Sequence, residues 1–165
     1  MNIFVTSYCP EQCAWALDDK RLVKMVLETA QMISTVMRSF GITDSRLYKS
    51  THKNHPCTRW TSESLPNFCW TLTHGIALAE EYTHRYGKTH KSATIFDTAR
   101  EWADIIAVHL PSSLLTEHVI ATAWGDLKEL NPVDAYREMM RRKWAQDEEN
   151  GRPPKWTLRG APEWR

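Results

Sequence analysis

The polar residues with the clearest chemical pattern lie in a segment of helical period, Asp19 to Phe40. At about 100° per residue, apolar side chains cover well over half of the circumference of this helix. A helix that is apolar on three sides lies inside a protein, and its polar face must meet water, a partner or a ligand because an unpaired buried charge is costly. That face is a continuous strip at i, i+3, i+7, i+10 and i+14, formed by Arg21, Lys24, Glu28, Gln31 and Thr35.

Two interpretations of this strip stay open. In the first it is a wall of an active site, where Glu28 acts as acid or base and Lys24 or Arg21 binds an anion. In the second it faces solvent, and Lys24 pairs with Glu28 one turn away. Lysine before glutamate is the weaker order for such a pair.

A second group of chemically capable residues lies in a segment without acidic residues, from Ser45 to Ser62. Lysine and arginine neutralise phosphates, asparagine and threonine position them, and an aromatic ring stacks on a base. His52, His55 and Cys57 could also bind zinc, but their spacing matches no common zinc motif, so zinc is the less favoured interpretation and no cofactor is expected. The predicted nucleic-acid-binding residues of this segment are Tyr48, Lys49, His52, Lys53, Asn54, Arg59 and Trp60.

A third, basic cluster lies at a helix–helix junction and consists of Arg85, Lys88, His90 and Lys91. Arg85 and Lys88 fit cations that complement the C-terminal end of a helix dipole. His90 and Lys91 sit where the next helix begins, a place that favours a bound anion. A phosphate at this junction is therefore possible beside the simpler structural explanation.

The elements that must position these residues are helical. The periodicity and cap residues predict an all-α fold, a compact single-domain bundle over residues 1–165. A short extended start over residues 2–6 is expected to be an edge strand or a tucked-in arm, and a long loop covers residues 41–59. Residues 110–130 have no clear period, and the irregular tail, 151–165, holds two tryptophans that indicate docking on the body. The predicted helices are Pro10–Leu17, Asp19–Phe40, Ser64–Tyr86, His90–His109 and Asn131–Asn150.

Length and composition exclude several classes of protein. With 165 residues, 42% hydrophobic and 25% charged, the chain is expected to form one ordinary globular domain. Its N-terminus lacks the pattern of a signal peptide, and no apolar run could span a membrane, so we expect a cytoplasmic protein whose four cysteines are thiols. A net charge of +1 does not by itself indicate a nucleic-acid partner. The absence of Walker, GxGxxG, GxSxG and HExxH motifs argues against nucleotide-driven, Rossmann and serine-hydrolase chemistry.

The order of the motifs resembles the pyrimidine-dimer DNA glycosylases, the endonuclease V type of phages and bacteria. It more closely resembles a set of small phage proteins, which would place the chain in a host cytoplasm. The resemblance covers residues 1–92. Its motifs are Leu22-Val23 with Glu28 and Gln31, Tyr48-Lys49 with Asn54-His55-Pro56, and Arg85-Tyr86-Gly87-Lys88 with His90-Lys91.

The resemblance implies a small monomer that bends DNA and flips a nucleotide out of the helix. In that family the N-terminal α-amine attacks the sugar carbon as the base leaves, and an ordinary α-amine, with a pKa of about 7.7–8.0, is partly neutral near pH 7. Here Met1 or Asn2 would carry the amine, and Glu28 falls at the place of the glutamate that stabilises the sugar cation. His55 is a further catalytic candidate. Leu27 stands where the family has a basic residue.

The predicted function is therefore that of an enzyme acting on DNA, a glycosylase that excises a damaged or modified base, with or without an AP-lyase step. Two alternatives stay open. One is an enzyme that modifies DNA bases or nucleotides, with or without a metal. The other is a nucleic-acid-binding module without catalysis, in which Glu28 is only a surface partner.

Overall fold

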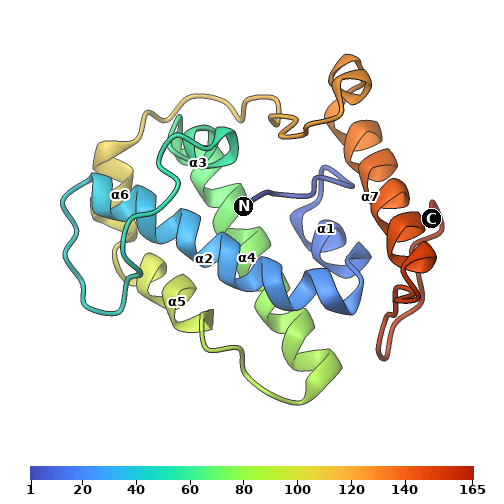
Figure 1. The fold of residues 1–165 in the computed structure, drawn as a ribbon. Helices are drawn as coiled ribbons and strands as arrows, with labels where there is room; N and C mark the ends of the chain where they lie inside the picture. Colours follow the sequence, from blue (N-terminus) through green and yellow to red (C-terminus); the bar gives the residue numbers. More distant parts are fainter.

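A computed structural model describes all residues, 1–165, and contains seven α-helices, one short 3₁₀ helix and no strand (Figure 1). This confirms the predicted all-α fold. No helix combines the length and the apolar character that crossing a membrane requires. The elements are α1 (Pro10–Ala16), α2 (Asp19–Ser39), α3 (Pro56–Thr61), α4 (Leu65–Tyr86), α5 (Ala93–Glu101), α6 (Ala103–His109), η1 (Gly125–Glu129) and α7 (Pro132–Glu149).

The two longest helices, α2 and α4, form the centre of the fold. α4 packs against α1, α2, α3 and α5, and α2 packs against α3 and α5 as well. The apolar positions that predicted α2 as a central helix, such as Leu22, Val26 and Ile33, are fully buried. Gly75 lets α4 approach α5 closely, because a Cβ at this position would collide with the ring of Phe96.

Cap residues lie at the ends of α4 and α7, whereas Asp18, at the start of α2, forms no side-chain cap hydrogen bond. Ser64 Oγ accepts a hydrogen bond of 3.2 Å from the backbone nitrogen of Asn67 at the start of α4. Gly87 ends that helix in the left-handed conformation, with φ of 63°. Asn131 Oδ1 accepts a hydrogen bond of 3.0 Å from the backbone nitrogen of Asp134 at the start of α7.

Two predicted boundaries were wrong. The segment expected as one helix over His90–His109 divides at Trp102 into α5 and α6. A break of one residue leaves the apolar period nearly intact, so periodicity does not detect it. The loop expected over residues 41–59 ends early, because α3 begins at Pro56, where His55 Nδ1 accepts a hydrogen bond of 3.2 Å from the Cys57 backbone nitrogen.

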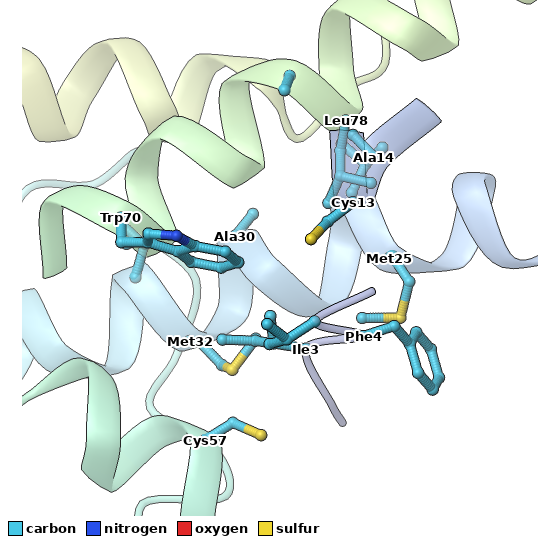
Figure 2. Packing of buried hydrophobic residues seen from close by; sticks show 14 of the residues in the cluster. Ile3, Phe4, Cys13, Ala14, Met25, Ala30, Met32, Cys57, Trp70 and Leu78 are labelled. Carbon is cyan, nitrogen blue, oxygen red and sulfur yellow. The ribbon is translucent and has the colours of Figure 1, made fainter. Parts of the chain in front are cut away.

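The N-terminal arm, residues 1–6, forms no strand and is tucked into the core. Ile3, Phe4 and Val5 are buried. Figure 2 shows Ile3 near Met32 and Phe4 beside Met25, both residues of α2. Burial of three apolar side chains in a row fixes the start of the chain against α2.

The irregular tail docks on the body, as its tryptophans indicated. Trp156 Nε1 donates a hydrogen bond of 3.0 Å to the carbonyl oxygen of Ala16. The ring of Trp164 stacks on that of Trp144 in α7, with centroids 5.4 Å apart. Between α6 and η1, the 110–124 segment runs over the top of the molecule towards α7 (Figure 1).

Candidate functional site

A cleft of about 490 Å³ lies where the N-terminal arm, α2, the 110–124 segment and α7 meet. Such a volume lies within the range of ligand-binding pockets. Its walls are half apolar and carry several cations and one carboxylate, that of Glu28. The lining residues are Met1, Asn2, Phe4, Lys20, Arg21, Lys24, Met25, Glu28, Ala121, Thr122, Ala123, Trp124, Met139 and Lys143.

Inside this cleft the start of the chain meets Glu28. The α-amine of Met1 lies 3.5 Å from Glu28 Oε2, and 12% of the Glu28 side chain is exposed. The Asn2 backbone nitrogen donates a hydrogen bond of 3.1 Å to the same oxygen. Only 1% of the Met1 side chain is exposed, and Thr58 Oγ1 donates a weak hydrogen bond to its sulfur. The structure thus brings together Met1, Asn2 and Glu28, which the sequence singled out.

The Asn2 side chain is held by groups from distant parts of the chain. Its Nδ2 donates a hydrogen bond of 2.9 Å to the carbonyl oxygen of Ala121. Its Oδ1 lies 3.0 Å from the Tyr136 hydroxyl and 3.4 Å from the Cys57 thiol. Burial raises the pKa of Cys57 to about 11, so its thiol keeps its proton and can donate. These contacts fix the backbone of the first two residues next to Glu28.

Cations line the mouth of the cleft. Lys24 Nζ lies 3.3 Å from Glu28 Oε1 and is largely exposed. Lys20 and Arg21 both pair with Asp147. Lys143 of α7 is half-buried and forms no ion pair; burial, followed by the charges of Arg21 and Lys24, lowers its pKa. Arg21, Lys24 and Glu28 of the polar strip therefore line the cleft, and Lys24 also forms an ion pair with Glu28. Gln31 and Thr35 lie outside the cleft, and the catalytic role of Glu28 stays a prediction.

His55 lies near the amine at the start of α3. Its Nδ1 accepts the hydrogen bond that caps this helix, so in the neutral ring Nε2 carries the proton. Burial, then the charge of the N-terminal ammonium and that of His52, lowers the pKa of His55. A neutral imidazole beside an ammonium group can take part in proton movement, and the catalytic role of His55 stays a prediction.

The basic loop before α3 presents most of its predicted DNA-binding residues to solvent. Tyr48 is half-buried, and its hydroxyl lies 2.9 Å from Ser92 Oγ. His52 has a positive φ of 49°, and its Nδ1 lies 2.7 Å from Thr51 Oγ1. The exposed members are Lys49, His52, Lys53, Asn54 and Arg59.

Two residues expected at a DNA surface lie in the interior instead. Trp60 is 1% exposed, and its Nε1 donates to the carbonyl oxygen of Glu117, so its ring is closed to a base. The Arg85 side chain is fully buried. It donates to Glu81 and Asp19 and to two carbonyl oxygens of the α1 region. Arg85 therefore links α4 to the start of α2, and its buried side chain is not accessible to a phosphate.

The remaining residues of the third cluster lie on the turn between α4 and α5. Lys88 and Lys91 are exposed. His90 Nδ1 accepts a hydrogen bond of 3.1 Å from the Ser92 backbone nitrogen. In Figure 1 this turn lies at the lower edge of the molecule, away from the N-terminus. The third cluster is therefore separate from the cleft.

Zinc has no suitable group of ligands here. Cys57 points to Asn2, whereas His52 and His55 make local contacts in the loop. Nowhere in the chain do three or more His, Cys, Asp or Glu side chains converge as metal ligands do.

Four of the site residues that sequence reasoning missed come from the second half of the chain. They are Trp124 of the 110–124 segment and Met139, Tyr136 and Lys143 of α7. Two signals were present in the sequence. The unusual number of tryptophans, eight in 165 residues, did not indicate which of them lines a site, and the basic run Arg141-Arg142-Lys143 is typical of a solvated helix face.

A family model described as pyrimidine dimer DNA glycosylase matches residues 1–94. No curated protein matches the chain, and no solved structure does. The match includes the N-terminal arm, Glu28 and the basic loop. It ends before the 110–124 segment and α7, which form the other side of the cleft.

Proposed function

The chain belongs to the pyrimidine dimer DNA glycosylase family, and we propose that it excises a damaged or modified base from DNA with its N-terminal amine and Glu28. A single observation carries this proposal. The Met1 amine and the Asn2 nitrogen both lie within 3.5 Å of one carboxylate oxygen in an open cleft. An amine beside a carboxylate at a cleft floor is the pair that covalent glycosylase chemistry requires.

The chemistry follows from these two groups. The neutral amine nitrogen bonds to C1′ of the deoxyribose while the bond between C1′ and the base breaks. The base leaves with the bonding electron pair and takes up a proton. Glu28 stabilises the positive charge that develops on the sugar and can accept the proton that the amine nitrogen loses. The C1′–O4′ bond then breaks, O4′ takes up the proton that Glu28 accepted, and the amine nitrogen forms an imine with C1′. This imine links protein and sugar and is the intermediate from which a lyase step would eliminate the 3′ phosphate.

DNA is the partner that the surface around the cleft supports. Lys20, Lys24 and the half-buried Lys143 lie at the cleft, and Lys49, Lys53 and Arg59 lie on the loop before α3. Their positive charge suits the phosphates of a duplex. The overall charge of the chain is nearly balanced, and two of these cations have acidic partners, Asp147 for Lys20 and Glu28 for Lys24.

The test is a trapping and product assay with the wild type and with Glu28→Gln. Both proteins are incubated with ultraviolet-irradiated DNA, and separately with DNA from the source of the protein, in the presence and absence of borohydride. We expect the wild type to release a base and to form a reduced covalent adduct. Glu28→Gln should lose activity by about 10²–10⁴-fold. The Glu28 role is wrong if this variant keeps full activity on every substrate that the wild type processes.

The absence of any adduct, released base or strand cleavage by the wild type would overturn the glycosylase proposal. Base modification would then be sought as a mass change in the DNA. Salt-dependent binding without any product would indicate a nucleic-acid-binding module.

A further inference from the structure

The cleft has two walls of different origin. The N-terminal arm and α2 supply the wall with the amine and Glu28, whereas residues 121–124 and α7 supply the other wall. In Figure 1 the N-terminus lies in the region bounded by α2, the 110–124 segment and α7. The second wall lies wholly outside residues 1–94, which match the family. Its side chains are therefore features of this chain that the family match does not account for.

Lys143 on this second wall lacks an ion-pair partner, although the charge of Asp147 acts on it from farther away. Lys20 and Arg21 have Asp147, and Lys24 has Glu28, but Lys143 forms no ion pair. A half-buried ammonium group next to other cations is unfavourable unless an anion binds there. A phosphate group is the anion that DNA would supply at this place.

Trp124 supplies an aromatic surface next to that cation. Its indole lines the cleft and is half-buried. The Lys143 ammonium lies 5.4 Å from the ring centroid, and the Arg142 guanidinium carbon lies 5.7 Å from it. These cation–π contacts hold the ring against α7. The half-buried indole gives the cleft an apolar surface of the kind on which a base stacks, whereas Met25 and Met139 in the cleft lining are each only 2% exposed.

We propose that Trp124 and Lys143 form the subsite for the extruded nucleotide, in which the indole stacks on the base and the ammonium binds the phosphate. The proposal rests on the proposed function and adds to it the part of the chain that selects the base. The 5.4 Å between the ammonium and the ring centroid lets one nucleotide reach both groups. Trp124 and Lys143 are thus specificity-determining residues, separate from the reacting pair of amine and Glu28.

The experiment compares Trp124→Ala, Trp124→Phe and Lys143→Met with two matched controls, Trp15→Ala and Arg100→Met. Trp15 and Arg100 are exposed and lie outside the cleft. Binding to a duplex with one cyclobutane thymine dimer, and to the same duplex without damage, is measured by fluorescence anisotropy at several salt concentrations. For the binding measurements, every variant also carries Glu28→Gln. For the excision measurements, every variant keeps Glu28. Thermal unfolding checks that each variant is folded.

We expect Trp124→Ala to weaken binding of the dimer duplex by about 5- to 150-fold, since base stacking contributes about 1–3 kcal/mol. The affinity of Trp124→Phe for the dimer duplex should lie between that of Trp124→Ala and that of the parent. The affinity for the undamaged duplex should change less. Lys143→Met should reduce the slope of log K against log salt by about 0.9, the effect of one phosphate contact. The two control variants should bind as the parent does.

Two outcomes separate this inference from the proposed function. Excision by the wild type together with unchanged binding by folded Trp124→Ala and Lys143→Met would overturn the subsite and leave the glycosylase proposal standing. Lack of excision by the wild type, together with selective loss of dimer binding in these variants, would overturn the glycosylase proposal and support the subsite.

Discussion

The backbone nitrogen of Asn2 donates a hydrogen bond of 3.1 Å to Oε2 of Glu28. The α-amine of Met1 lies 3.5 Å from the same oxygen. Removal of Met1 would turn the Asn2 nitrogen into the α-amine without moving it away from the carboxylate. The pair of amine and Glu28 is therefore available whichever residue comes first in the working protein.

This relationship predicts that an N-terminal extension abolishes covalent trapping. An added Gly-Ser converts the Met1 amine into an amide, whose nitrogen is not nucleophilic. The two added residues must also pass out of the cleft beside the buried Met1 side chain. We expect no borohydride-dependent adduct from this protein. The control carries the same two residues after Arg165, where they leave the cleft untouched. A full yield of adduct from the N-terminally extended protein would show that another amine reacts.

A second prediction concerns the contacts that hold Asn2. Asn2→Ala removes the hydrogen bond to Ala121 and the contact with the Tyr136 hydroxyl. The amine then loses its fixed position, and a displacement of about 1 Å can reduce a rate by about 10²-fold. We expect kcat to fall by roughly 10- to 100-fold, while KM changes little because Asn2 is not expected to bind DNA.

Tyr136→Phe provides the milder comparison, since it removes only the hydroxyl and keeps the ring packed against Phe4. It should reduce kcat less than Asn2→Ala does. Single-turnover excision at saturating enzyme measures both effects. A rise in KM with unchanged kcat would place Asn2 in substrate binding and contradict the positioning role.

The fold and half of the cleft were predictable because they depend on local patterns. The apolar period of α2 placed Glu28 on a polar strip, and the caps Ser64, Gly87 and Asn131 set the ends of the long helices. The other half of the cleft depends on contacts between residues far apart in the chain. The hydroxyl of Tyr136 and the side chain of Asn2, for example, are separated by 134 positions.

Charge alone also could not separate surface residues from buried ones. Arg85 belongs to a run of basic residues that is typical of a phosphate site, yet Glu81 lies one turn before it on α4, and Asp19 reaches it from another helix. Asp19 is brought there by the fold. Trp60 likewise has no sequence feature that distinguishes a buried indole from an exposed one.

Arg85 gives a third prediction, in which stability and DNA binding respond differently. Arg85→Met leaves the buried Glu81 with Arg159 as its one remaining ion-pair partner. It also removes the hydrogen bonds that Arg85 donates to the carbonyl oxygens of Leu17 and Trp15. Breaking a buried ion pair from one side costs about 3–5 kcal/mol of unfolding free energy. We expect a loss of this size in urea unfolding, and no change in the salt dependence of DNA binding by the folded protein.

Lys88→Met is the matched control for Arg85→Met, because Lys88 lies on the same basic turn and is exposed. Its unfolding free energy should stay within about 0.5 kcal/mol of the wild type. A stable Arg85→Met variant with a reduced salt slope would mean that Arg85 contacts phosphate after all.

The last prediction concerns two buried histidines, His74 and His118, that both contact the ring of Trp70. His118 stacks on Trp60 and meets the edge of Trp70, and His74 stacks on the same Trp70. The Nε2 atom of each histidine is buried without a hydrogen-bond partner. Burial lowers the pKa of both residues to about 4. In an unfolded chain the same group has a pKa of about 6.5.

Between pH 6.5 and pH 4 the unfolded chain therefore binds protons at these histidines, and the folded protein does not. Their contribution to stability is complete above pH 6.5 and is lost as the pH falls towards 4, at about 1.4 kcal/mol per pH unit for each histidine. His118→Phe keeps an aromatic ring against Trp60 and removes one titrating group, so the unfolding free energy should depend less steeply on pH in this range. His84→Asn changes an exposed histidine and should keep the wild-type slope. Urea unfolding at intervals from pH 7 to pH 4.5 measures the slopes, and equal slopes for His118→Phe and the wild type would show that His118 is not buried in its neutral form.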